Sequence, residues 1–228
     1  AYRMEELITN HLAMMDSINP QRWVKLIVDE WGTWYDVEEG TNPGFLYQQN
    51  TMRDAIVAGL TLNIFNKHAD RLMMANIAQT VNVLQSVILT DGEKMIKTPT
   101  YYVFKMYKEH QENTLVGSYI TTPLVNSPND NKDFPQLCES ASVDENGTIY
   151  STITNNSSTK SAKIKCQIAD TKVESITAEI LTGECHQKND FDNADNVKTV
   201  EFTDFRKLKD GFTAAIPACS VVKFVINK

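Results

Sequence analysis

The 228-residue sequence lacks the features that mark several large classes of protein. No apolar run approaches the ~20 residues of a membrane-spanning helix, so we expect no membrane partner. The net charge is −7, and no basic stripe runs along the chain, which argues against a nucleic-acid partner. No Cys-x-x-Cys pair and no histidine at zinc-ligand spacing is present, so we expect no metal and no organic cofactor.

The cysteines all lie in the second half of the chain, at positions 138, 166, 185 and 219. Small buried side chains on strands are the favoured interpretation, although a disulfide stays open and the sequence does not pair them. The chain also begins without a signal peptide, at Ala1 rather than at Met. Cytoplasmic, periplasmic and secreted locations therefore all stay open.

The most informative stretch present is Trp23 to Tyr35. Its apolar run, Val24 to Val28, predicts a strand buried on both faces, as in a parallel sheet. Asp29 and Glu30 follow at the carboxyl end, where (β/α) barrels carry their catalytic groups. Carboxylates beside flat aromatic rings suit sugar chemistry, because one oxygen must meet the anomeric carbon while ring faces hold the sugar.

The rest of the first half alternates helical patterns with one short apolar run. Apolar positions at helical spacing predict helices over 2–16, 45–66 and 99–111, and a short apolar helix over 80–90. Residues 72–77 predict a second strand, and 36–44 a turn-rich loop in which Glu38 and Glu39 are solvated charges. If the two strands are parallel neighbours, the second delivers Gln79 to the same end as Glu30.

From about residue 115 the apolar pattern changes to a period of two. Ile164, Cys166 and Ile168 alternate with polar residues, and Val222, Phe224 and Ile226 do so near the end of the chain. Six or more such runs separated by Asn- and Gly-rich turns predict an antiparallel β-sandwich. Residues 126–135 and 186–196 predict polar loops, and the aspartates of the second loop do not fit an EF-hand calcium site.

Several of these blocks resemble the α-L-arabinofuranosidases of glycoside hydrolase family 51. The resemblance begins with Leu26-Ile27-Val28-Asp29-Glu30-Trp31-Gly32-Thr33-Trp34-Tyr35. It continues through residues 66–71, 75–84 and 99–104, and more weakly through 191–193 and the last strand. It therefore covers nearly the whole chain, and its first two blocks are specific.

The resemblance implies a role for three residues. Glu30 inherits the part of the nucleophile, Trp34 helps to wall the sugar subsite, and Gln79 reaches the substrate from the last barrel strand. The family's general acid/base is a Glu in an Asn-Glu pair on an earlier barrel strand, and this sequence contains no Asn-Glu dipeptide. We expect Asp29 to orient the strand end, and the resemblance further implies a homo-oligomer.

The expected fold is the C-terminal part of a (β/α)₈ barrel, residues 1–114, followed by a jelly-roll-like β-sandwich, residues 115–228. A whole barrel typically takes ~250 residues, so we expect the C-terminal half of a larger enzyme. Its activity would be retaining removal of terminal α-L-arabinofuranosyl residues from arabinose-containing saccharides, with no turnover by this fragment alone.

Three alternatives remain open at this point. The chain fits another retaining hydrolase on a related barrel, acting on xylosides or glucans. It also fits a non-catalytic carbohydrate-binding sandwich, although Trp23, Trp31 and Trp34 all precede residue 115 and no aromatic platform marks the later strands. The third alternative is an assembly role for the sandwich.

Overall fold

The computed structural model describes residues 1–127 and 132–228. The helices and strands of its first part are α1 (Arg3–Ile18), β1 (Leu26–Trp31), η1 (Pro43–Phe45), α2 (Met52–Lys67), β2 (Leu72–Ile77), β3 (Ile88–Asp91), β4 (Lys94–Lys97), α3 (Pro99–Tyr107) and η2 (Lys108–His110). The later strands are β5 (Thr114–Val116), β6 (Leu124–Ser127), β7 (Lys132–Pro135), β8 (Leu137–Val143), β9 (Ile149–Asn155), β10 (Ala162–Gln167), β11 (Ser175–Thr182), β12 (Val200–Glu201), β13 (Phe205–Lys207), β14 (Gly211–Ile216) and β15 (Ser220–Asn227).

The later strands form an antiparallel sandwich. One sheet has the order β12-β11-β15-β9-β8-β5, and the facing sheet has the order β10-β14-β13. Between them lies an apolar core in which the rings of Phe212 and Phe224 stack with their centroids 4.3 Å apart. The alternating pattern read from the sequence produces this arrangement, because every second side chain of a strand points into the core.

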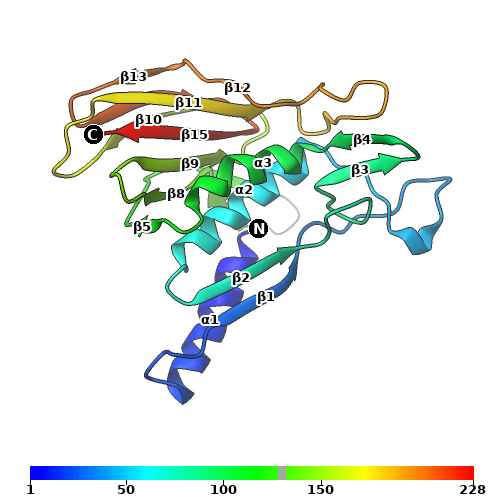
Figure 1. Cartoon of the computed structure of the whole chain (residues 1–228), viewed down its shortest axis with the longest axis horizontal. Helices are drawn as coiled ribbons and strands as arrows, with labels where there is room; N and C mark the ends of the chain where they lie inside the picture. Colours follow the sequence, from blue (N-terminus) through cyan, green and yellow to red (C-terminus); the bar gives the residue numbers. More distant parts are fainter. Residues whose placement is uncertain (128–131) are drawn as a thin grey trace.

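Helices α2 and α3 cover the other face of the six-stranded sheet. Helix α2 packs against β8, β9 and β15, and α3 packs against α2 and β11. Figure 1 shows both helices lying between this sheet above and the pair β1–β2 below. The hydrophobic cluster around α2 includes Trp31 of β1, Phe65 of α2 and Val221 of β15, so it joins the two halves of the chain.

Helix α2 approaches the sandwich unusually closely at Gly59. A Cβ atom at this position would lie 2.5 Å from Thr154 Oγ1 and 3.0 Å from Val221 Cγ2. The backbone carbonyl of Gly59 also accepts a hydrogen bond from the Tyr107 hydroxyl at 2.9 Å. Glycine is therefore required here for close packing rather than for its backbone freedom.

Strands β1 and β2 pair in parallel, as expected, with Trp31 opposite Ile77. Leu26 and Val28 point towards the cluster around α2, whereas the Ile27 side chain is 47% exposed. The prediction of a strand buried on both faces is therefore wrong for the described part of the chain. The reason is that the helices cover one face of this two-stranded sheet, and no described element covers the other.

Three local predictions also need correction. Residues 80–90 do not form a helix: they run through turns into β3, and Asn82 and Leu84 adopt positive φ angles of 59° and 52°. The helix expected from residue 45 begins only at Met52, where Thr51 and Asp54 form a capping box. The polar loop expected over 126–135 is wrong for its described residues, because 126–127 belong to β6 and 132–135 to β7, which pair antiparallel; residues 128–131 lie outside the described residues.

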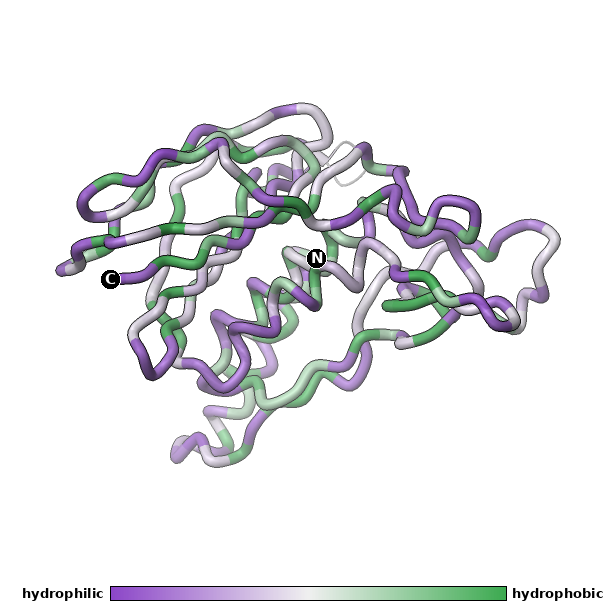
Figure 2. The backbone as a smooth tube through the Cα atoms, turned by 45° about the horizontal axis from the view of Figure 1, so that its top comes forward, coloured by the Kyte–Doolittle hydropathy of each residue, from purple (hydrophilic) through white to green (hydrophobic). Residues whose placement is uncertain are grey.

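The helices expected over 2–16 and 99–111 are present as α1 and α3, although α3 ends at Tyr107 and the short 3-10 helix η2 follows it. Figure 2 shows hydrophilic residues gathered in the outer loops and hydrophobic residues recurring along the strands and helices. The expected fold class, the end of a barrel followed by a β-sandwich, is confirmed. The last helical element, η2, ends at His110, and the first strand of the six-stranded antiparallel sheet, β5, begins at Thr114, near the predicted boundary at residue 115.

Candidate active site

The carboxyl ends of β1 and β2 form the candidate site. Glu30 is the second-last residue of β1, and its carboxylate has no hydrogen-bond or ion-pair partner among the described residues. The neighbouring carboxylate of Asp29 is likewise exposed and makes no such contact among the described residues. The expected role of Asp29 in orienting the strand end is therefore not supported by any hydrogen bond of its side chain in this part of the chain.

Gln79 lies at the same end of the sheet. The pairing of the two strands continues past β2, because the Ala78 backbone N–H donates to the Trp31 carbonyl at 2.8 Å. Gln79 follows directly and its side chain is exposed. The register therefore brings Glu30 and Gln79 to one edge, as the parallel arrangement predicts.

Gly32 permits the close approach of the two strand ends. Its φ angle is +145°, and a Cβ atom there would lie 3.3 Å from both the Ala78 carbonyl oxygen and the Gln85 side-chain oxygen. A larger residue would be strained in this conformation and would press against the neighbouring chain. The glycine that follows Trp31 in the sequence thus fixes the spacing at the edge of the site.

The third candidate, Trp34, stands on the segment after β1 and is 68% exposed. Its neighbours are not free. Thr33 is buried and donates from its backbone N–H to Gln85 Oε1 at 2.9 Å, and the Tyr35 backbone N–H donates to Gln48 Oε1, also at 2.9 Å. The indole is therefore exposed between two residues that are both held in place.

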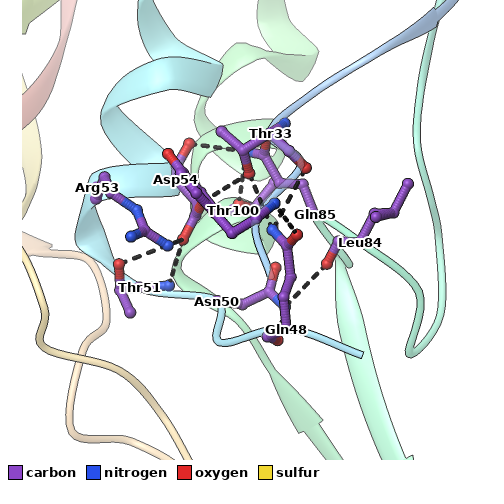
Figure 3. Close-up of polar contacts among 10 residues, drawn as sticks. Thr33, Gln48, Asn50, Thr51, Arg53, Asp54, Leu84, Gln85 and Thr100 are labelled. Carbon is purple, nitrogen blue, oxygen red and sulfur yellow. Dashed lines mark hydrogen bonds and ion pairs between the residues drawn. The ribbon is translucent and has the colours of Figure 1, made fainter. Parts of the chain in front are cut away.

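A buried polar network supports this segment from below (Figure 3). The Asp54 carboxylate, 0% exposed, accepts from the Thr33 hydroxyl at 2.6 Å and from the Thr51 backbone N–H at 2.8 Å. Arg53 forms an ion pair with Asp54 at 3.5 Å and lies over the Tyr35 ring, 3.6 Å from its centroid. This network was not predicted from the sequence. Only the capping-box residues Thr51 and Asp54 form a local sequence pattern that indicates part of it.

Burial raises the pKa of two tyrosines near the site. For Tyr35 the nearby Arg53 guanidinium acts in the opposite direction and lowers the pKa. Burial also raises the pKa of Tyr47, and the charge of Glu38 adds to that shift. Both phenols therefore stay neutral in the range in which a carboxylate is ionised.

No group of three or more His, Cys, Asp or Glu in the described ranges is arranged to hold a metal ion. In the loop 186–196, the Asp190 carboxylate already accepts the backbone N–H groups of Asp192 and Asn193, at 3.1 and 2.8 Å. Among the helices of residues 1–127 and 132–228, none is long and apolar enough to span a membrane.

The edge offers two exposed and unpaired carboxylates, Asp29 and Glu30, and the amide of Gln79, and the Trp34 indole is exposed on the segment after β1. A carboxylate of this kind can act as a nucleophile towards an anomeric carbon, with the amide binding hydroxyl groups and the indole lying against a sugar face. Glycosidases use a second carboxyl group as acid and base. Glu38 and Glu39 make no ion pair in the described part of the chain, and both lie on the loop after β1.

Comparison with known proteins shows the family of the chain. A family model described as the alpha-L-arabinofuranosidase C-terminal domain matches residues 29–220. The chain is 42% identical over 220 residues to an intracellular exo-alpha-L-arabinofuranosidase of Bacteroides ovatus, covering 96% of this chain and 43% of that protein. It is 27% identical over 146 residues to an intracellular exo-alpha-(1->5)-L-arabinofuranosidase of Halalkalibacterium halodurans, covering 59% of this chain and 28% of that protein.

Solved structures give the same result. The crystal structure of the GH51 arabinofuranosidase from Xanthomonas axonopodis pv. citri superposes with a TM-score of 0.94 at 41% identity, over 98% of this chain and 45% of that one. The arabinose complex of the alpha-L-arabinofuranosidase from Thermotoga maritima superposes with a TM-score of 0.80 at 22% identity, over 98% of this chain and 47% of that one, and shows the shared fold. The chain thus spans less than half the length of these relatives.

Proposed function

The chain belongs to the α-L-arabinofuranosidases of glycoside hydrolase family 51 and matches their C-terminal domain, and from that premise we propose that it carries the nucleophile of a retaining glycosidase. The reaction is removal of terminal α-L-arabinofuranosyl residues from arabinose-containing polysaccharides or oligosaccharides. Glu30 is the nucleophile, while Trp34 and Gln79 bind the sugar.

In the first step a Glu30 carboxylate oxygen attacks the anomeric carbon of the arabinofuranose. The bond from that carbon to the leaving oxygen breaks, and the leaving oxygen takes a proton from a second carboxyl group. Water then hydrolyses the glycosyl ester, giving up its proton to the same second group. Two inversions retain the anomeric configuration, and this mechanism places the two carboxyl groups ~5–5.5 Å apart.

The observation that carries the proposal is the state of Glu30. The Glu30 carboxylate is exposed and has no partner among the described residues, so no structural ion pair engages it. It lies at the carboxyl end of β1, the end at which barrel enzymes carry their catalytic groups, and both the Gln79 amide and the Trp34 indole are exposed on the segments that follow β2 and β1. An unpaired charge with aromatic and amide neighbours supports a binding and reacting role over a structural ion pair.

The second carboxyl group is not assigned to this chain. The family's acid/base belongs to an Asn-Glu pair, and the sequence contains none. We therefore expect the 228-residue chain, assayed by itself, to leave arabinofuranosides intact. The division at residue 115 and a homo-oligomeric state stay predictions.

The test is a chimera in which residues 1–228 replace the matching part of the Bacteroides ovatus enzyme. We expect the chimera to hydrolyse an aryl α-L-arabinofuranoside, and Glu30→Gln to abolish that turnover. Asp29→Asn is the matched control, because it neutralises the adjacent exposed carboxylate and should leave most activity. Turnover that survives Glu30→Gln, or turnover by the 228-residue chain alone, would contradict the proposal; preference for an aryl xyloside would favour another substrate class.

A further inference from the structure

The segment after β1 is held at alternate residues. The backbone N–H groups of Thr33 and Tyr35 each donate to a glutamine side chain, Gln85 and Gln48 respectively. Trp34, between them, makes no hydrogen bond among the described residues and is 68% exposed. Loops at a protein surface ordinarily give their backbone N–H groups to water, so two buried side-chain acceptors in three residues are an unusual anchorage.

Gln85 connects this segment to the end of the other strand. Its side-chain amide donates to the Asp54 backbone carbonyl at 2.7 Å and to the Thr100 hydroxyl at 3.1 Å. Its own backbone N–H donates to the Ala78 carbonyl at 3.1 Å, and Ala78 precedes Gln79. One residue therefore contacts both strand ends, the first helix turn of α2 and the start of α3.

Gln48 completes the support from the opposite side. Its amide donates to the Thr33 hydroxyl at 3.2 Å, so the two glutamines meet at Thr33, as Figure 3 shows. Gln85 is 0% exposed and Gln48 is 1% exposed. Both amides make their hydrogen bonds, and an aliphatic side chain in either place would leave the backbone N–H of Thr33 or Tyr35 without its acceptor.

We propose that Gln85 and Gln48 are positioning residues of the arabinofuranosyl subsite, which set the placement of Trp34 relative to Gln79. The inference rests on the proposed function of Glu30. The two glutamines touch neither substrate nor reacting atoms; they act through the backbone on either side of Trp34 and, through Ala78, on Gln79. Displacements of about 1 Å at such walls reduce rates by as much as about 100-fold.

A spectroscopic test applies to the 228-residue chain itself. Trp23, Trp31 and Trp34 are its only tryptophans, so labelling with fluorotryptophan gives three ¹⁹F resonances, assigned by single Trp→Phe variants. We expect Gln85→Met, and separately Gln48→Met, to shift or broaden the Trp34 resonance and to leave that of Trp23 unchanged. A Trp34 resonance that stays in place in both variants overturns the inference, whatever the activity of the protein.

A kinetic test uses the chimera described above. We expect Gln85→Met to lower kcat/KM for the aryl arabinofuranoside by about 10- to 100-fold, with a rise in KM, because the walls that bind the sugar move. Loss of folded protein would instead lower the apparent kcat at unchanged KM. The matched control is Asn63→Leu, which removes another fully buried amide from the same core; Asn63 accepts from Ser140 and Thr152 in the sandwich, away from the site.

The outcomes separate the two proposals. If Glu30→Gln leaves turnover intact, the proposed function fails, and the ¹⁹F result still decides whether the glutamines position Trp34. If Glu30→Gln abolishes turnover while Gln85→Met and Gln48→Met match Asn63→Leu in kcat and KM, the positioning role fails and the proposed function stands. Should Gln85→Met not fold, Gln48→Met carries both measurements.

Discussion

The contact between α2 and the sandwich can be tested at Gly59. A Cβ atom added there would lie 2.5 Å from Thr154 Oγ1 and 3.0 Å from Val221 Cγ2, inside the distances that real Cβ atoms keep. Both neighbours are β-branched residues of buried strands, so their rotamers are restricted. The helix must therefore move away from the sheet to admit the methyl group.

The expected change in the free energy of unfolding combines two opposing effects. Replacing a helical glycine with alanine favours the helix by about 1 kcal/mol. Overpacking a well-packed core costs about 1–3 kcal/mol, and displacement of α2 also weakens the hydrogen bond from the Tyr107 hydroxyl to the Gly59 carbonyl, worth about 1 kcal/mol. With that hydrogen bond lost, we expect Gly59→Ala to destabilise the chain by about 1–3 kcal/mol.

A double-mutant cycle identifies the cause. Urea unfolding followed by far-ultraviolet circular dichroism would give the stability of Gly59→Ala, Thr154→Ala and the double variant. Because Thr154→Ala removes the closest atom, we expect the double variant to be more stable than additivity predicts by about 1 kcal/mol or more. Thr154→Val keeps the branched shape and should give no such relief. A stabilising Gly59→Ala, or purely additive effects with Thr154→Ala, would refute the close contact.

Three further results are expected. Asp54→Ala should destabilise the chain by about 2–4 kcal/mol in urea unfolding, because it removes the capping box and leaves the Thr33 hydroxyl and the Thr51 N–H without their buried acceptor. Asp54→Asn should destabilise the chain less. Burial lowers the pKa of His110 to about 4, so the unfolded chain takes up a proton first as pH falls. Stability should decline between pH ~6.5 and ~4 by up to about 3 kcal/mol, and His110→Gln should flatten this decline if the account is right. Phe212→Ala should cost about 3–5 kcal/mol, since the ring is fully buried between the sheets; a cost below about 1 kcal/mol would contradict its place in the core.

The sequence predicts those parts of the fold in which a regular apolar pattern meets a matching burial. The alternation around Ile164 and around Phe224 predicts strands that the structure contains, and the run from Leu26 predicts β1. The helical spacing over residues 2–16 likewise predicts α1. For α1 and the later strands the period of the pattern equals the period of the element, whereas β1 was predicted from a continuous apolar run, which gave the strand but not its exposed face.

The errors come from residues whose conformation depends on distant partners. Leu84 belongs to an apolar run that suits a helix, but its φ is positive and its side chain is buried, and neither property has a signal in the sequence. Gln85 is the clearest case in the site. Its side chain contacts residues that are separated from it by 52, 31 and 15 positions in the sequence. No local sequence pattern therefore indicates that this amide is buried.

Part of the candidate site could be predicted from the sequence. Glu30 follows an apolar run, and that alone indicates a carboxylate at a strand end. Trp34 and Gln79 have no such pattern; only the resemblance to family 51 singled them out. The structure adds the reason that Gln79 lies at the same edge as Glu30, which is the parallel register of β1 and β2 continued through Ala78.

Covalent trapping of the nucleophile tests the central claim most directly. The chimera would be incubated with a fluorinated arabinofuranosyl donor, which slows hydrolysis of the glycosyl ester, then digested and sequenced by mass spectrometry. The account predicts one added sugar mass per chain, on the Glu30 side chain, and none after Glu30→Gln. A label on Asp29, Glu38 or any other carboxylate of residues 1–228, or a protein that turns over substrate without ever being labelled, would contradict it.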